Sequence, residues 1–257
     1  MRIERILANN PGPFTGPGTN TWLLEAGDHV VVIDPGPVDA GHLEQIVARV
    51  AGRAPVGVLV THTHIDHAPL ANRLARELGV PAFGHSAGPD FDPDLVLIDG
   101  SELAIGSTRL GVIHTPGHAD DHLCFRVGDV LFTGDHIMGG SSVMVEDMGS
   151  YLASLTRLRG TGLTRLHPGH GEEMDQPDQV IDWYLAHRRQ RHEEILEAIR
   201  SGARSRDEIV EVVYRDVDRA LHPLAARSVQ AHLELMFDQG QIASIGHDLV
   251  VLSTETP

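Results

Sequence analysis

Short hydrophobic stretches of strand length recur through the first two thirds of the chain. Residues 2–8 and 19–34 are predicted to be strands, with a hairpin turn at Gly27-Asp28. Gly128-Asp129 joins two further runs as a second hairpin. The other apolar runs with the length of buried strands are 56–60, 80–83, 95–98, 110–113, 122–127, 130–133 and 163–166.

Between these runs, hydrophobic residues return with the spacing of an amphipathic helix. Residues 38–52 place Leu43, Ile46 and Val50 on one face, and 68–78 and 150–158 repeat the pattern. The helix at 68–78 is expected to hold Asp66 and His67 at its N-terminus. A chain that alternates strands and helices in this way predicts an α/β fold, with two packed sheets and helices outside.

Beyond residue 175 the composition changes to helix formers. We predict one long helix over 178–201, a second that starts at the capping sequence 205–208, and a third over 225–238 that Gly240 closes. Residues 242–252 then form a small hairpin around Gly246-His247. Three helices and a hairpin resemble a winged helix, so we expect a domain boundary between residues 175 and 176.

Composition excludes some functions. All 20 basic residues are arginine, so Schiff-base chemistry and a P-loop lysine are both ruled out. The net charge of −16 opposes nonspecific binding to nucleic acid. The single cysteine, Cys124, lies in a strand-like run and is expected to pack in the core. No apolar run approaches membrane-spanning length and residues 1–6 lack a secretory h-region, so the cytoplasm is the expected location.

The side chains that carry chemistry come where strand-like runs end. Residues 61–67 hold three histidines and an aspartate directly after the run 56–60. Imidazole suits zinc, and a carboxylate among imidazoles suits a second divalent ion beside the first. His118, Asp135 and His170 each follow a later run, with Gly or Pro in the turn. Because loops at the carboxyl ends of strands gather sites from distant parts of an α/β chain, we predict a metal site there.

This pattern resembles the metal-binding motifs of the metallo-β-lactamase superfamily. The seven residues that carry the resemblance are His62, His64, Asp66, His67, His118, Asp135 and His170. A closer resemblance, to the subgroup around beta-lactamase-like protein 2, extends over nearly the whole chain and rests on residues 134–139, 151–155, 184–188 and 193–196. One departure is Pro69-Leu70, where family members often carry Gly-Gly.

The resemblance implies an αββα four-layer sandwich over 1–175, which is the catalytic domain, and a winged-helix-like domain over 176–257. It assigns His62, His64 and His118 to one metal and Asp66, His67 and His170 to the other, with Asp135 as the bridge. Two zinc ions per chain are implied, with iron or manganese as alternatives, and a hydroxide between them would be the nucleophile. Asp66 and Asp135 are the catalytic residues.

Three residues near the motifs have open roles. By the resemblance, Asp34 is a carboxylate that orients a metal ligand or a loop, while by its local sequence it is a turn or cap residue. His122 and His136 are candidates for contact with substrate because they neighbour Asp120 and Asp135.

Several functions are compatible with these motifs. The one we favour is hydrolysis of a small-molecule ester, thioester, lactone or lactam, with weak β-lactamase activity included. Alternatives are a single-strand endoribonuclease, an activity associated with the beta-lactamase-like protein 2 subgroup, a true antibiotic-destroying lactamase, and a non-enzymatic, metal-stabilised regulator. Two zinc ions (+4), two aspartates (−2) and a hydroxide (−1) sum to +1, so an anionic substrate is expected.

The expected partners follow from charge. Residues 205–257 contain four Arg against nine Asp or Glu, a net of −5, so we expect this domain to pack or act as a lid rather than recognise DNA. RNA remains a candidate partner, and no membrane partner is expected. The oligomeric state is not determined by the sequence.

Overall fold

The computed structural model describes residues 1–139, 142–245 and 249–252. Its contacts divide the chain into two compact units, and each is described by itself. The first unit comprises residues 1–143 and 160–178, and the second comprises 144–159 and 179–257. The sequence-based boundary between residues 175 and 176 stays a prediction.

The first sheet of the first unit has six strands in the order β1-β2-β3-β4-β5-β6. β1, β2 and β3 pair antiparallel, with the predicted hairpin at Gly27-Asp28, and β3 to β6 run parallel. Helices α1 (Ala40–Val50) and α2 (Ala71–Leu78) connect its parallel strands. The strand bounds are β1 Arg2–Leu7, β2 Asn20–Ala26, β3 His29–Ile33, β4 Ala54–Leu59, β5 Ala82–Gly84 and β6 Leu95–Val96.

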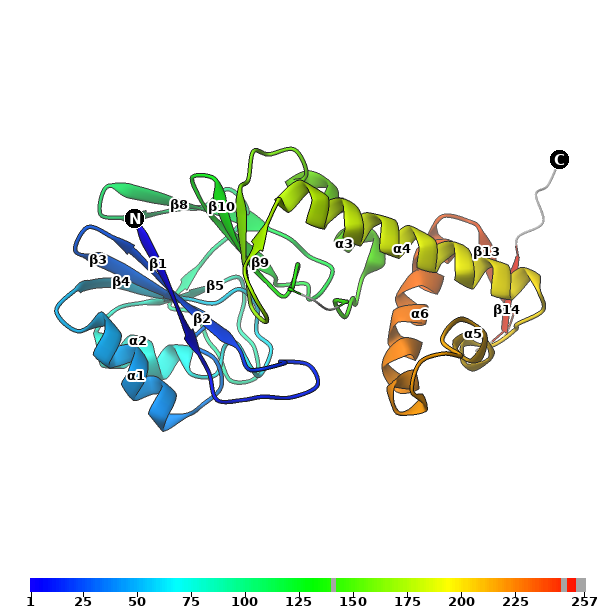
Figure 1. The fold of residues 1–257 in the computed structure, drawn as a ribbon, viewed down its shortest axis with the longest axis horizontal. Helices are drawn as coiled ribbons and strands as arrows, with labels where there is room; N and C mark the ends of the chain where they lie inside the picture. Colours follow the sequence, from blue (N-terminus) through cyan, green and yellow to red (C-terminus); the bar gives the residue numbers. More distant parts are fainter. Residues whose placement is uncertain (140–141, 246–248, 253–257) are drawn as a thin grey trace. The chain divides into compact units, whose positions relative to one another are not determined.

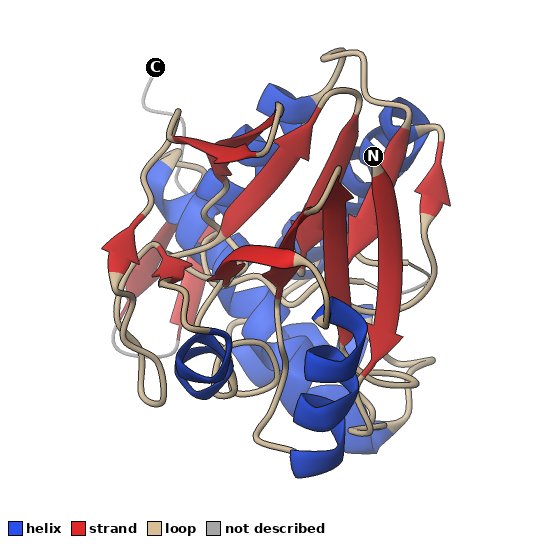
Figure 2. Cartoon of the chain, turned by 90° about the vertical axis from the view of Figure 1, so that its left-hand side faces the viewer, coloured by secondary structure: helices blue, strands red, loops and turns tan. Residues whose placement is uncertain are grey.

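The second sheet has the order β12-β11-β10-β9-β8-β7. Only β10 and β11 pair parallel, and β9 and β10 form the predicted hairpin around Gly128. The two sheets and their helices confirm the predicted sandwich fold (Figures 1 and 2). The strand bounds are β7 Glu102–Ile105, β8 Thr108–His114, β9 Leu123–Val127, β10 Val130–Gly134, β11 Arg165–Pro168 and β12 Met174–Asp175.

Side chains on the two faces of the first sheet belong to two different hydrophobic cores. In β3, Val30 and Val32 pack with residues of α1 and α2, whereas Val31 and Ile33 belong to the core that also holds Phe125 and Phe132 of the second sheet. Because successive side chains point to opposite faces of a strand, a sheet buried on both sides reads as the continuous apolar run seen at 30–33. Cys124 is fully buried, as expected.

The strands that precede the candidate ligands end at the same edge of the sandwich. β8, β10 and β11 are mutually parallel, so their carboxyl ends coincide. The loop after β4 joins them there, because the backbone N–H of Leu123 donates to the carbonyl of Thr61 at 2.7 Å. A second link is the 2.7 Å hydrogen bond from the N–H of Asn20 to the carbonyl of Gly169.

Helix α2 differs from its prediction at the N-terminus. It begins at Ala71 rather than Ala68, so Asp66 and His67 lie in the loop before it. The physical reason is Pro69: a proline disfavours the helical conformation of the preceding residue and donates no N–H. Asp66 and His67 are therefore held by loop contacts instead of a helix end.

The described residues of the second unit form four α-helices, the first turn of α4 excepted, a short 3-10 helix and a hairpin. Ser205 caps α5 by accepting from the N–H of Glu208, as its sequence predicted. The third predicted helix starts earlier, at His222, and the turn at Gly246-His247 lies outside the described residues. The bounds are α3 Met148–Leu158, α4 Pro177–Arg200, α5 Arg206–Val213, η1 Arg219–Leu221, α6 His222–Asp238, β13 Ile242–Ile245 and β14 Leu249–Leu252. No helix in the described ranges is long and apolar enough to cross a membrane.

Candidate metal centre

Three histidines form the first group of converging nitrogens. Nε2 of His62 lies 2.9 Å from Nδ1 of His64 and 3.3 Å from Nε2 of His118. The third side of the triangle, from His118 Nε2 to His64 Nδ1, is 3.0 Å. His62 and His64 come from the loop after β4 and His118 from the loop after β8, so the triangle joins the two sheets.

The second group combines two histidines with a carboxylate. Nε2 of His67 lies 3.2 Å from Nε2 of His170, which in turn lies 3.1 Å from Oδ2 of Asp66. The distance from His67 Nε2 to Asp66 Oδ2 is 3.7 Å. His170 follows β11, so this group also spans both sheets.

Asp135 lies between the two groups. Its carboxylate oxygens are 3.4 Å from Nε2 of His67, 3.4 Å from Nε2 of His170 and 3.8 Å from Nε2 of His118. It follows β10 and is 6% exposed, and its Oδ1 has no hydrogen-bond partner in the described part of the chain. A buried carboxylate in this position is placed to serve both groups.

These distances fit metal coordination. Bonds of about 2.0–2.1 Å to a tetrahedral ion place neighbouring ligand atoms roughly 3.3–3.4 Å apart, close to the separations in both groups. Neighbouring imidazole nitrogens this close need a cation or a proton between them. The structure brings all seven predicted side chains together, in overlapping groups with the donor types that divalent metals accept. Their individual assignment as ligands stays a proposal.

Asp34 orients one histidine of each group. Its carboxylate accepts from Nδ1 of His67 at 2.9 Å and from the hydroxyl of Thr61 at 2.7 Å. The same hydroxyl accepts from Nδ1 of His62 at 3.0 Å. When the rings are neutral, these hydrogen bonds favour the proton on Nδ1, so that each Nε2 presents a lone pair to the centre. Asp34 therefore has the orienting role implied by the resemblance.

Other contacts to the ligand loops had no signal in the sequence. The side-chain amide of Asn20 donates to the carbonyls of Pro168 and Gly171 at 3.0 and 2.9 Å, which fixes the loop that carries His170. The carboxylate of Asp121 accepts from the N–H of Thr63 at 3.0 Å. Both residues act on backbone far away in sequence, so no local motif marks them.

His122 and His136 are not placed to touch substrate, contrary to the sequence-based expectation. Both are fully buried. Nε2 of His122 accepts from the backbone N–H of Asp135 at 3.2 Å, and its Nδ1 bonds the hydroxyl of Thr115 at 2.9 Å. His122 thus fixes the backbone position of Asp135 through this hydrogen bond.

The ionisable side chains of the two groups shift one another's pKa values. Burial alone would lower the pKa of His67, but Asp135 and Asp34 outweigh burial and hold it well above its usual value. For His170, burial is likewise outweighed by hydrogen bonds to Asp135 and Asp66, which raise the pKa to about 9. Burial, with His67 and His118 nearby, holds the pKa of His62 well below its usual value. The carboxylates of the cluster thus favour the charged forms of His67 and His170.

Two glycines leave room for the centre. A Cβ on Gly169 would lie 2.5 Å from Oδ1 of Asp135 and 2.6 Å from Cε1 of His67. A Cβ on Gly134, whose φ is +45°, would lie 2.7 Å from Nε2 of His122. Since a side chain at either position would displace ligand or supporting atoms, the glycines are steric requirements of the site.

Converging imidazoles and carboxylates at one edge of a two-sheet sandwich define a metal-dependent hydrolase. The chain belongs to the metallo-beta-lactamase superfamily, whose model matches residues 14–170. A second model, the beta-lactamase associated winged helix domain, matches residues 205–248. The two-part organisation read from the sequence, a sandwich followed by a winged helix, is confirmed.

Relatives match most of the chain. It is 31% identical to a Beta-lactamase-like protein 2 homolog of Drosophila melanogaster, over 93% of this chain and 89% of that protein. It is also 31% identical to an Atrochrysone carboxyl ACP thioesterase of Aspergillus chevalieri, over 86% of this chain and 73% of that protein. The crystal structure of a metallo-beta-lactamase family protein from Thermus thermophilus shares the fold, with a TM-score of 0.82 over 98% of each chain at 22% identity.

Proposed function

We propose that this hydrolase uses two zinc ions and a hydroxide that bridges them to cleave a small-molecule carbonyl substrate, with thioesters as the first class to test. The observation that carries the proposal is Asp135, whose carboxylate lies within 3.8 Å of ligand nitrogens in both groups. A shared carboxylate between two sets of donors supports two adjacent ions rather than one.

The metal and the protein have separate tasks. When bound, zinc lowers the pKa of coordinated water to about 7 and polarises the oxygen of the group under attack. Asp34 and Thr61 hold the ligand rings in the required tautomers, and His122 holds the backbone of Asp135. Iron or manganese would be accepted by the same mixed donor set.

Asp66 is the candidate ligand placed to accept a proton from the nucleophile. Its side chain is 21% exposed, against 9% for Asp135, so it lies on the more open side of the centre. Although burial raises its pKa, the hydrogen bond with His170 and the nearby His67 bring it below the usual value. An ionised carboxylate there can orient the nucleophile and accept its proton.

The carbonyl class is favoured by charge and by a relative. The predicted site charge of +1 suits an anionic substrate, whereas the overall charge of −16 disfavours a long polyanion such as RNA. Ile65, between two candidate ligands, is 76% exposed and offers an apolar contact to an acyl chain. The relative named as an acyl-carrier-protein thioesterase makes thioesters the first choice.

The test measures metal content and substrate range together. Protein purified without added metal is analysed for bound metals and assayed on a thioester, a lactone, a chromogenic lactam and single-stranded RNA. The Asp135→Asn variant keeps the side-chain volume but loses the charge, and Glu44→Ala, which removes an exposed carboxylate from α1, is the control. We expect about two zinc ions per chain, thioester hydrolysis, and at least a 100-fold loss in Asp135→Asn alone.

Other outcomes have definite meanings. RNA cleavage that Asp135→Asn abolishes, without turnover of any carbonyl substrate, would replace the proposal with the endoribonuclease alternative. A single bound metal with full activity would remove the bridging role of Asp135. Full activity in a protein stripped of metal would overturn the mechanism.

A further inference from the structure

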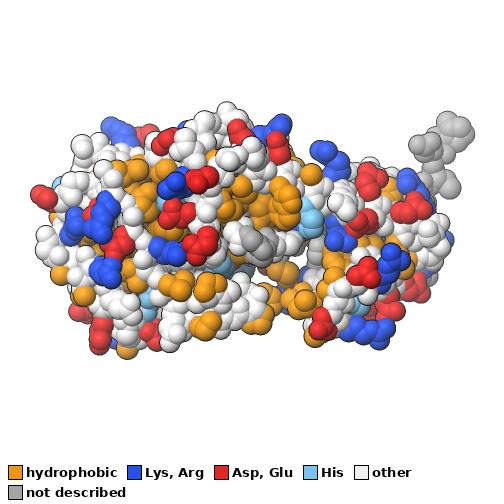
Figure 3. Space-filling view, in the orientation of Figure 1, with side chains coloured by type: hydrophobic (Ala, Val, Ile, Leu, Met, Phe, Trp, Pro, Cys, Tyr) orange, Lys and Arg blue, Asp and Glu red, His pale blue; other side chains and the backbone are white. Residues whose placement is uncertain are grey.

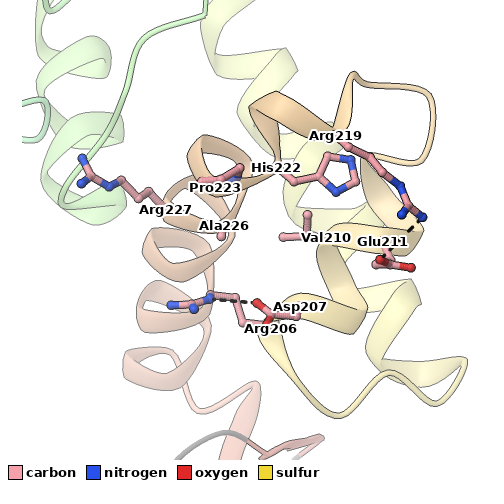
Figure 4. Close-up of a pocket in the computed structure, with 9 residues that line it drawn as sticks. All are labelled: Arg206, Asp207, Val210, Glu211, Arg219, His222, Pro223, Ala226 and Arg227. Atoms are coloured by element: carbon pink, nitrogen blue, oxygen red, sulfur yellow. Dashed lines mark ion pairs between the residues drawn. The ribbon is translucent and has the colours of Figure 1, made fainter.

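A pocket of about 570 Å³ lies in the winged-helix domain, between α5, η1 and α6. Three arginines and a histidine line it: Arg206, Arg219, Arg227 and His222. In Figure 4, Arg206 and Arg227 lie on one side of the pocket and Arg219 and His222 on the other, with Val210 and Ala226 between them. The pocket therefore has an apolar floor and a charged rim, to which Asp207 and Glu211 also belong.

The arginines are only weakly neutralised. Nε of Arg206 is 3.6 Å from Oδ1 of its neighbour Asp207, and Arg219 is 4.0 Å from Glu211. These are exposed pairs of long separation, which contribute little in water. Within the described ranges Arg227 makes no ion pair, so the pocket side chains carry three positive charges against two negative ones.

His222 adds an unmet hydrogen-bonding atom. Its Nε2 is buried and has no hydrogen-bond partner in the described chain. Because this nitrogen is closed to solvent, a ligand in the pocket would reach it only after the His222 ring turns. His222 is also the first residue of α6, a 17-residue helix with no acidic residue in its first turn and no side-chain cap. The helix dipole favours an anion at this end, where the carboxylate of Asp218 caps the preceding 3-10 turn by accepting from the N–H of Ala220.

We propose that this pocket binds the phosphate monoester group of a small molecule. Arginine guanidinium groups bind phosphate oxygens through paired N–H donors. The floor formed by Val210, Pro223 and Ala226 would hold the organic part of the ligand. None of the candidate metal ligands lines this pocket, so the inference does not depend on the proposed hydrolase activity.

A small ligand fits better than a nucleic acid strand. A strand needs a track of cations that follows several phosphates, but residues 205–257 carry four Arg against nine acidic residues. On the face drawn in Figure 3, acidic and basic side chains of this domain are interspersed. A local cluster around one pocket matches a single dianionic group.

The test follows the pocket itself in the full-length, metal-loaded protein. Adenosine monophosphate and inorganic phosphate are titrated while the ring ¹H–¹⁵N signals of His222 are observed by NMR, which separates this pocket from phosphate bound at the metal centre. We expect saturable shifts of His222 and at least a tenfold weaker affinity in Arg219→Gln. The control Arg200→Gln removes an exposed arginine of α4 outside the pocket and should bind as the unmodified protein does.

Three results would overturn the proposal. The first is that neither phosphate nor the nucleotide shifts the His222 signals. The second is that Arg219→Gln and Arg200→Gln weaken binding equally, which would indicate a general charge effect. The third is that a short single-stranded oligonucleotide binds the pocket far more tightly than the monophosphate, with a steep salt dependence, which would assign it to a nucleic acid.

Discussion

At the scale of single residues, Asp34 is the most informative position because one carboxylate orients ligands of both groups. In Asp34→Asn, the amide oxygen can still accept from Thr61, but the charge that holds the proton on Nδ1 of His67 is lost. We expect metal affinity to fall about 10- to 100-fold while the fold is retained. Competition with a chromophoric chelator measures this affinity.

The matched control for Asp34→Asn is the same substitution at Asp28. Asp28 lies in the exposed turn between β2 and β3, where asparagine is equally suited. Metal affinity should not change in this variant. Equal affinities in Asp34→Asn and the unmodified protein would mean that the ligand rings orient without Asp34.

Gly169 tests the steric requirement at the centre. An added methyl group would lie within 2.6 Å of Asp135 and His67, so Gly169→Ala should lose at least one metal per chain. Metal analysis by mass spectrometry checks this result. In the control Gly111→Ala, the nearest atom to the new Cβ is 3.9 Å away, and metal content should stay normal. A fully loaded Gly169→Ala protein would show that the loops can move apart at little cost.

At the scale of elements, the packing of α4 and α6 creates a pH-dependent contact. His232 of α6 is 1% exposed, and neither of its ring nitrogens has a hydrogen-bond partner in the described residues. Burial, with Arg188 and His192 of α4 nearby, lowers its pKa from 6.5 to about 3. The unfolded chain therefore binds a proton at His232 below about pH 6.5, whereas the folded protein binds one there only below about pH 3.

This difference makes stability fall as the pH falls from 6.5 towards 3, by up to about 1.4 kcal/mol per pH unit for His232. In His232→Gln, the loss between about pH 7.5 and about pH 5 should be smaller by roughly 2 kcal/mol. Urea unfolding with chelator present measures it, since metal release is then excluded. The control is His29→Gln, which replaces an exposed histidine and should keep the original pH dependence of stability. An unchanged dependence in His232→Gln would mean that the folded protein holds His232 in its charged form.

At the scale of the whole molecule, metal binding links stability to the centre. Seven side chains from four loops converge there, and without a cation their charges are balanced only by protons. At free metal about 1,000 times above Kd, each site contributes about 4 kcal/mol, so chelation should lower Tm on the order of 10 °C. Calorimetry of loaded and stripped protein tests this expectation.

Hydrogen exchange provides an internal control for the chelation experiment. Amides in the loops after β4, β8, β10 and β11 should lose protection when metal is removed. Amides of α5 and α6, which belong to the other compact unit, should change little. Equal loss of protection in both units would point to global destabilisation, and no change in either would count against a metal that is integrated with the fold.

The sequence by itself determined the elements, the fold class and the set of candidate ligands. Strand and helix periodicity arises from local geometry, and residues such as His62, Asp66 and His170 stand in short contiguous motifs, so both can be read from neighbouring positions. The predicted start of α2 at Ala68 is wrong because Pro69 disfavours the helical conformation of the residue before it.

Only the tertiary structure decided how those residues are supported. The bonds from Asn20 and Asp121 to distant backbone, and the hydrogen bond of His122 to Asp135, join segments whose proximity depends on the packing of two sheets. The gathering of Arg206, Arg219 and Arg227 around one pocket likewise reverses the local sign of an acidic domain. Charge counts average over a sequence, whereas a site depends on which side chains the fold brings within a few ångströms.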